Sequence, residues 1–163
     1  MANPLYDKLI SKNSNKNTCF LEQSGKAAVS FCQFSERTNQ VANLLVKYGL
    51  QPGDRVAVQA AKTIEIIILY AATIQAGGVF LSLNTDYKKD EVAYFLKDAK
   101  PRIFVCDPYK VEDLKNVASQ VGSKILTSDA HGTGILLSES NLMSKIFNTV
   151  DRKPDDLAAL LYT

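Results

Sequence analysis

Apolar positions from residue 35 onward first recur with the period of an amphipathic helix. Four apolar side chains between Val41 and Tyr48 lie at i, i+3, i+4 and i+7, the spacing of one helix face. Ser35 suits the N-cap of this helix, and Gly49 suits the position just past its end. The pattern therefore predicts a helix over residues 35–48.

Helical and strand patterns then alternate to the end of the chain. Pro52 and Gly53 fit the central positions of a type II turn, because proline presets the first φ and glycine accepts the positive second one. We expect helices between Thr63 and Ala76, between Lys88 and Ala99, and between Asp107 and Gly122. We expect strands over Arg55–Ala60, Val79–Leu83, Arg102–Cys106, Lys124–Thr127 and Leu157–Tyr162.

Three other segments complete the pattern. Pro4–Ser11 predicts a short lead-in helix, and the β-like runs Cys19–Glu22 and Lys26–Phe31 predict a hairpin, since Gly25 between them accepts a tight turn. The run Ile64–Ala72 is apolar on almost every side, interrupted by Glu65, which predicts a helix that is covered all round. Leu137–Phe147 is compatible with a helix or with an irregular connection.

The alternation of strands and helices indicates an α/β fold. Consecutive parallel strands need helical crossovers, so we expect a layered, mostly parallel sheet with helices on both faces. Ligands of such sheets bind beyond the carboxyl ends of the strands. The loops after Leu83, Cys106, Thr127 and Tyr162 are therefore the places to look for a site.

Composition and charge exclude several classes of protein. With 163 residues, 46% of them hydrophobic and 22% charged, the chain has the composition of a globular domain. The 19 basic and 17 acidic residues form no basic stripe, which argues against nucleic acid as a partner. No apolar run approaches the roughly 20 residues that cross a bilayer, so no membrane is expected. Three dispersed cysteines and the lack of a signal pattern predict a cytoplasmic protein.

Individual candidates for chemistry have a structural interpretation that we favour. The lone histidine, His131, lacks a partner that would make it a general base. Gly77-Gly78 follows a helix instead of preceding one, which is the wrong end for anion binding. Gly132-Thr133-Gly134 lacks the third glycine of a dinucleotide site and the lysine of a Walker loop.

Two further candidates are weighed in the same way. Asp155-Asp156 could be read as paired carboxylates, but neighbouring side chains on a strand point to opposite faces, so a solvated lead-in is favoured. Cys106 ends a predicted strand without a basic neighbour to lower its pKa, so we expect it to pack in the core. We predict neither a catalytic residue nor a metal ligand in this chain.

Three stretches carry a resemblance to a known family. They are Val41–Leu45 with Gly49–Ala57, Ile74–Asn84, in which Ser82 stands where proline is usual, and Asp155–Thr163. Together they resemble the adenylate-forming superfamily of acyl-CoA synthetases, and most of all the N-terminal part of malonyl-CoA synthetases. Residues 1–163 are then expected to be an N-terminal fragment of the AMP-binding (adenylation) large domain, with the remainder of that domain and the C-terminal domain absent. The apolar strand that runs into the C-terminus suggests the same truncation.

The resemblance implies an AMP-forming acid–CoA ligase as the parent. A small, malonate-like carboxylic acid, MgATP and CoA would be its substrates and cofactors, and the acid would be activated as an acyl-adenylate before transfer to the CoA thiol. Thr163 is the one site residue carried over, as the first residue of the loop that binds ATP phosphates. The fragment alone is expected to be inactive and to hold no cofactor tightly.

Two alternatives stay open on the sequence. The chain could be a standalone, non-catalytic α/β binding module, or its parent could activate another acid. An exposed terminal strand would favour self-association, which a standalone module would avoid.

Overall fold

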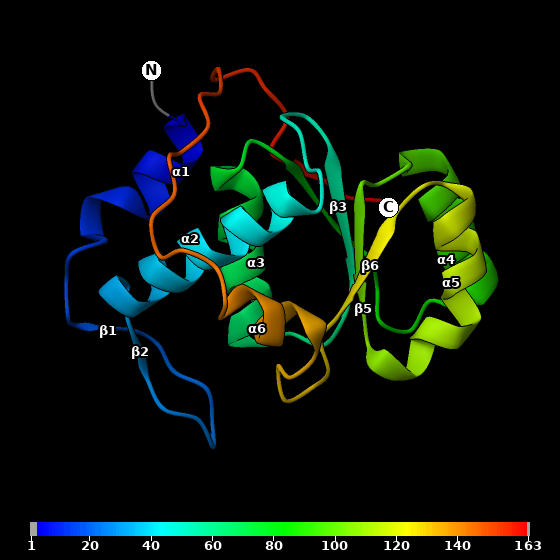
Figure 1. Ribbon diagram of the computed structural model, residues 1–163, viewed down its shortest axis with the longest axis horizontal. Helices are drawn as coiled ribbons and strands as arrows, with labels where there is room; N and C mark the ends of the chain where they lie inside the picture. The colour runs from blue at the N-terminus through cyan, green and yellow to red at the C-terminus, as the bar shows by residue number, and fades with distance from the viewer. Residues whose placement is uncertain (1–2, 163) are drawn as a thin grey trace.

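Five parallel strands form the centre of the protein, whose residues 3–162 are described by a computed structural model (Figure 1). The strands are β3 (Arg55–Gln59), β4 (Val79–Ser82), β5 (Ile103–Cys106), β6 (Lys124–Thr127) and β7 (Ala159–Leu160). They lie in the order β6-β5-β3-β4-β7, and each neighbouring pair is parallel. The predicted α/β fold with a mostly parallel sheet is confirmed.

Helices cover both faces of this sheet (Figure 1). On one side lie α1 (Pro4–Leu9), α2 (Phe31–Lys47), α3 (Ile64–Gln75) and α6 (Ile135–Ser140), and on the other lie α4 (Lys89–Ala99) and α5 (Val111–Gln120). Each side has its own apolar core, with Leu44 and Ile68 fully buried in the first and Leu96 and Phe104 in the second. Full burial of one such side chain contributes about 1.5–3 kcal/mol, so both layers stabilise the sheet.

The segments outside these layers are short. An antiparallel hairpin pairs β1 (Cys19–Leu21) with β2 (Val29–Ser30), as predicted, and η1 (Ser11–Asn13) and η2 (Pro108–Lys110) are single 3₁₀ turns. The turn at Pro52 and Gly53 also forms as predicted, since Gly53 has a φ of +87° and the Asp54 N–H donates to the Gln51 carbonyl at 3.0 Å. No helix within residues 3–162 is long and apolar enough to cross a membrane.

The start of α2 differs from the prediction. The helix begins at Phe31, with Ser30 as its N-cap, so Ser35 is an interior helical residue and the prediction of Ser35 as cap is wrong. The Ser30 hydroxyl accepts from the Gln33 N–H at 3.2 Å, and the Gln33 side chain accepts from the Ser30 N–H at 2.9 Å. This reciprocal capping box satisfies two N–H groups at once, which explains why the helix extends back into the predicted strand over Lys26–Phe31.

Two predictions about apolar segments also need correction. The helix α3 is covered on most sides, but Ile67 is 44% exposed, so it is not enclosed all round. The last strand is shorter than predicted and lies at the sheet edge, with Leu157 62% and Leu161 77% exposed. Both exposed leucines lie just outside β7, which within the described part of the chain pairs with β4 on one side alone. The ambiguous stretch Leu137–Phe147 is the end of α6 followed by an irregular connection.

Candidate functional site

A cleft of ≈ 840 Å³ opens at the carboxyl ends of the central strands. Its walls come from the ends of β3 and β4 and from the loops that follow β3, β4, β5 and β6, where ligands of open parallel sheets bind. Lys62 and Lys110 are the basic residues that line it and Asp107 is the acidic one, so the charged lining carries a net +1 (2 − 1). Of the four loops to which the sequence directed attention, those after Leu83, Cys106 and Thr127 contribute to the lining of this cleft.

Gln59, the last residue of β3, organises one wall of this cleft. Its side-chain amide donates to the carbonyl oxygens of Asn84 at 3.0 Å and Tyr87 at 2.8 Å, and so fixes the loop after β4. The Gln59 side chain is 1% exposed, and its Oε1 atom has no hydrogen-bond partner among the described residues. Lys110 supports the same loop from the other side, since its Nζ donates to the Thr85 carbonyl at 2.7 Å.

The end of the described chain pairs with β4, one of the strands that line the cleft. Phe80 pairs with Ala159 and Leu81 with Leu160 in parallel register, so residues beyond Leu160 continue toward the carboxyl end of β4. The Tyr162 hydroxyl donates to Asp98 on α4 at 2.5 Å. Thr163, the site residue taken from the resemblance, lies outside the described residues.

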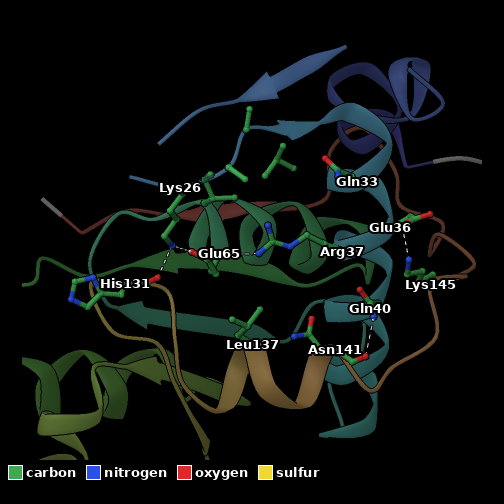
Figure 2. A pocket seen from close by; sticks show the side chains of 14 residues that line it. Lys26, Gln33, Glu36, Arg37, Gln40, Glu65, His131, Leu137, Asn141 and Lys145 are labelled. Carbon is green, nitrogen blue, oxygen red and sulfur yellow. Dashed lines mark hydrogen bonds and ion pairs between the residues drawn. The ribbon is translucent and has the colours of Figure 1, made fainter. Parts of the chain in front are cut away.

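A second pocket, of ≈ 760 Å³, lies between the hairpin and helices α2, α3 and α6 (Figure 2). Its most buried charge is Glu65, which is 8% exposed and pairs with Lys26 at 3.2 Å and with Arg37 at 3.1 Å. Lys26 also donates to the His131 carbonyl at 2.5 Å. Figure 2 shows Lys26 from the hairpin and Arg37 from α2 pointing toward Glu65, with His131 of the loop before α6 beside Lys26. The cluster ties four separate segments together.

The electrostatics of Glu65 follow from these contacts. Burial alone would raise the pKa of its carboxyl group, but hydrogen bonds from its own backbone N–H, from Lys26 and from Arg37 outweigh that effect and lower the pKa. The neighbouring Gly132 has a φ of +75°, and a Cβ atom there would overlap the Glu65 carboxylate. This pocket is built around a satisfied ion-pair cluster.

The structure supports a structural role for His131 and Cys106. His131 contributes its carbonyl oxygen to the Glu65 cluster, and its imidazole ring points away from Glu65 (Figure 2). Cys106 is fully buried in β5, and burial raises the pKa of its thiol to about 12, which keeps it protonated at neutral pH. Neither residue has the surroundings of a nucleophile or a general base.

The glycine and aspartate candidates are structural as well. Gly77 ends α3 with a φ of +78°, in the helix-stopping role. Gly132 and Gly134 shape the loop between β6 and α6. Asp156 accepts from the Lys153 N–H at 2.8 Å and pairs with Arg152 at 3.2 Å, whereas Asp155 is exposed, so the two carboxylates form no joint site. Within residues 3–162 no group of three or more His, Cys, Asp or Glu side chains could hold a metal ion.

Sequence reasoning missed Gln59 and the Glu65 cluster. Both had a signal, because each is a polar residue inside an otherwise apolar stretch of a predicted strand or helix. A buried polar or charged side chain needs partners, so Gln59 and Glu65 pointed to contacts elsewhere in the chain. The identity of the Glu65 partners depends on tertiary packing, because the hairpin brings Lys26 and α2 brings Arg37 to this carboxylate.

The chain belongs to the AMP-binding enzyme family, whose family model matches residues 10–163. The predicted membership of the adenylate-forming superfamily is thereby confirmed. Curated relatives include tyrocidine synthase 2 of Brevibacillus parabrevis, 30% identical over 98% of this chain and 4% of that protein. The probable CoA ligase CCL9 of Humulus lupulus is 27% identical over 86% of this chain and 28% of that protein. The chain thus spans a minor part of the length of these relatives.

Some solved structures share a higher sequence identity with this chain. Apo and ATP-bound MatB from Rhodopseudomonas palustris are each 42% identical over the whole of this chain and 32% of theirs, with a TM-score of 0.96. A benzoate CoA ligase from Burkholderia xenovorans LB400 has a TM-score of 0.80 at 18% identity, which shows the shared fold alone. The fold of this chain is that of the N-terminal part of an acyl-CoA synthetase large domain.

Proposed function

We propose that this chain is the N-terminal part of an AMP-forming acid–CoA ligase that activates a small dicarboxylic acid of the malonate type. The observation that carries the proposal is the 42% identity to MatB, a malonyl-CoA synthetase, over the full chain. A benzoate CoA ligase, an anthranilate CoA ligase and a fatty acyl CoA synthetase share 17–19% with it. Residues 1–163 would form the first part of the adenylation domain, and the rest of that domain and a C-terminal domain would complete the enzyme.

In the proposed parent, the acid carboxylate attacks the α-phosphorus of MgATP, and the CoA thiol then displaces AMP. The role of this chain is to supply the sheet, the cleft at its carboxyl edge and the start of the ATP phosphate loop, with Thr163 as its first residue. The likeness to ATP-bound MatB supports ATP as the nucleotide. The three free thiols suit the cytoplasm, where we place the protein.

The first test is acid-dependent exchange of pyrophosphate into ATP by the full-length parent. We expect kcat/KM for exchange to be at least about tenfold higher with malonate than with acetate, benzoate or a long-chain acid. A cation that pairs with the distal carboxylate of malonate would be left buried and unpaired by an acid that lacks this group, which is costly. Exchange with another acid but not with malonate would support the ligase activity and contradict a dicarboxylic acid as the substrate. A parent that lacks a glycine-, serine- and threonine-rich loop with lysine after Thr163 would contradict the ligase itself.

A second candidate substrate class is an amino acid. It is favoured by the similarity to the tyrocidine synthases and to the dimodular nonribosomal peptide synthase of Bacillus subtilis (strain 168), which is 33% identical over 45% of this chain. The acid panel therefore includes amino acids. Exchange with an amino acid alone would assign the parent to that class.

The second test concerns the 163-residue chain by itself. We expect it to be catalytically inactive and to bind MgATP too weakly for calorimetry at micromolar concentration, because most phosphate contacts would lie beyond Thr163. Its β7 edge is unpaired on one side, so sedimentation should detect self-association. Stoichiometric micromolar binding by a stable monomer would instead support a standalone binding module.

A further inference from the structure

Tyr162 is the last described residue, and its side chain is fixed on α4. Its hydroxyl donates to the Asp98 carboxylate at 2.5 Å, and its ring centroid lies 4.5 Å from that of Phe95 at an interplanar angle of 43°. Leu160 and Tyr162 both pack against the apolar core on the α4 side of the sheet. Leu157 and Leu161, by contrast, are largely exposed. Tyr162 is therefore the side chain that holds the chain where it leaves the sheet.

The same aromatic group holds a wall of the cleft. Phe95 also stacks on Tyr87, with ring centroids 5.0 Å apart and an interplanar angle of 28°. Tyr87 belongs to the loop after β4, and its carbonyl accepts the hydrogen bond from Gln59. One ring on α4 thus contacts both the loop after β4, which lines the cleft, and the last described residue of the chain.

We infer that Tyr162 is a positioning residue for the nucleotide: its bond to Asp98 and its contact with Phe95 set the point and direction in which the chain leaves β7. The inference rests on the proposed function, in which the segment starting at Thr163 binds the phosphates of ATP. Backbone donors stabilise a developing charge only when they are held in place beforehand, so the anchor of that segment affects ATP more than the acid.

The hydroxyl is suited to this role at neutral pH. Burial, and then the hydrogen bond and negative charge of Asp98, raise the pKa of Tyr162 to about 12. The phenol therefore remains protonated and can donate to the Asp98 side chain. A hydrogen bond to a charged acceptor is among the stronger ones, which suits a fixed anchor.

The test uses the full-length protein with the variant Tyr162→Phe, which removes the hydroxyl and keeps the ring. We expect KM for ATP to rise roughly fivefold to tenfold while KM for the acid stays within about twofold, since only the nucleotide-binding segment is released. Amide hydrogen exchange over residues 159–162 should accelerate in the same variant. Asp98→Ala should reproduce both effects, whereas Asp98→Asn, which keeps an acceptor, should restore most of the wild-type KM.

Two controls separate positioning from general damage. Tyr94→Phe removes a hydroxyl from an exposed tyrosine on the same helix and should change neither readout. The double variant Tyr162→Phe with Asp98→Ala should be no worse than either single variant, because both break the same bond.

The possible outcomes separate a failure of the inference about Tyr162 from a failure of the proposed function. Normal exchange by the wild type with an unchanged KM for ATP in Tyr162→Phe overturns the inference alone. An equal rise in KM for ATP and for the acid, or additive effects in the double variant, also overturns it. Absence of ATP–pyrophosphate exchange in the wild type with every acid overturns the proposed function, and with it the inference.

Discussion

Replacement of Gly134 by alanine is expected to destabilise the protein by at least about 3 kcal/mol. Gly134 has a φ of +135° and a ψ of −171°, a region that side chains rarely adopt, and a Cβ atom there would overlap the backbone carbonyl of Thr127. The backbone of β6 cannot yield as a flexible side chain could. The residue is also the N-cap of α6, whose first N–H, on Ile135, donates to the Thr127 hydroxyl at 3.0 Å.

Urea unfolding of the wild-type and variant chains measures this effect. Gly122→Ala is the matched control, because Gly122 has a φ of +74° with nothing within 4 Å of its virtual Cβ. Its cost should be limited to the backbone conformation, about 1 kcal/mol. Equal losses in the two variants would mean that contact with Thr127 contributes nothing.

The order and type of most elements could be predicted because their signals are local. The turn at Pro52 and Gly53 and the apolar runs of β3, β4 and β5 each need only a few neighbouring residues to be recognised. The start of α2 was misplaced because Ser30 and Ser35 are both plausible caps. The capping box with Gln33 decided between them.

The candidate site was harder to predict than the fold. The rule for parallel sheets located the cleft, but not Gln59, whose role depends on the loop after β4 lying across the end of β3. The length of the last strand depended on sheet order, since only β4 pairs with it. Contacts between segments far apart in the sequence leave no periodic pattern to read.

The Glu65→Gln variant is expected to lose roughly 2–3 kcal/mol of stability at neutral pH, because it leaves Lys26 and Arg37 without their shared carboxylate in a partly buried place. Glu65 is 8% exposed, while the two cations retain about a quarter of their side-chain surface, 27% each. Because the two cations are partly solvated, the expected loss of stability is smaller than for a fully buried ion pair. Thermal and urea unfolding at pH 7 measure it.

Glu36→Gln is the matched control on the rim of the same pocket. Glu36 pairs with Lys145 at 2.8 Å, but both side chains are exposed, so the loss should stay below about 1 kcal/mol. The same charge is removed in each variant, so the difference between them reports the greater burial of Glu65 together with its second cationic partner. Similar losses would contradict a special role for the Glu65 cluster.

The pH dependence of Glu65→Gln gives an independent check of the cluster. Its pKa is lowered from the ordinary value of 4.5 in the folded protein, despite burial, by the hydrogen bonds and the charge that surround the carboxylate. A depressed pKa means that the ionised group stabilises the fold above the unfolded-state pKa, and that this contribution is lost as pH falls through the folded-state value. The gap in stability between wild type and Glu65→Gln should therefore be constant near neutrality and narrow below about pH 4.5. A gap that widens with acid would mean that burial dominates and that the pKa is raised.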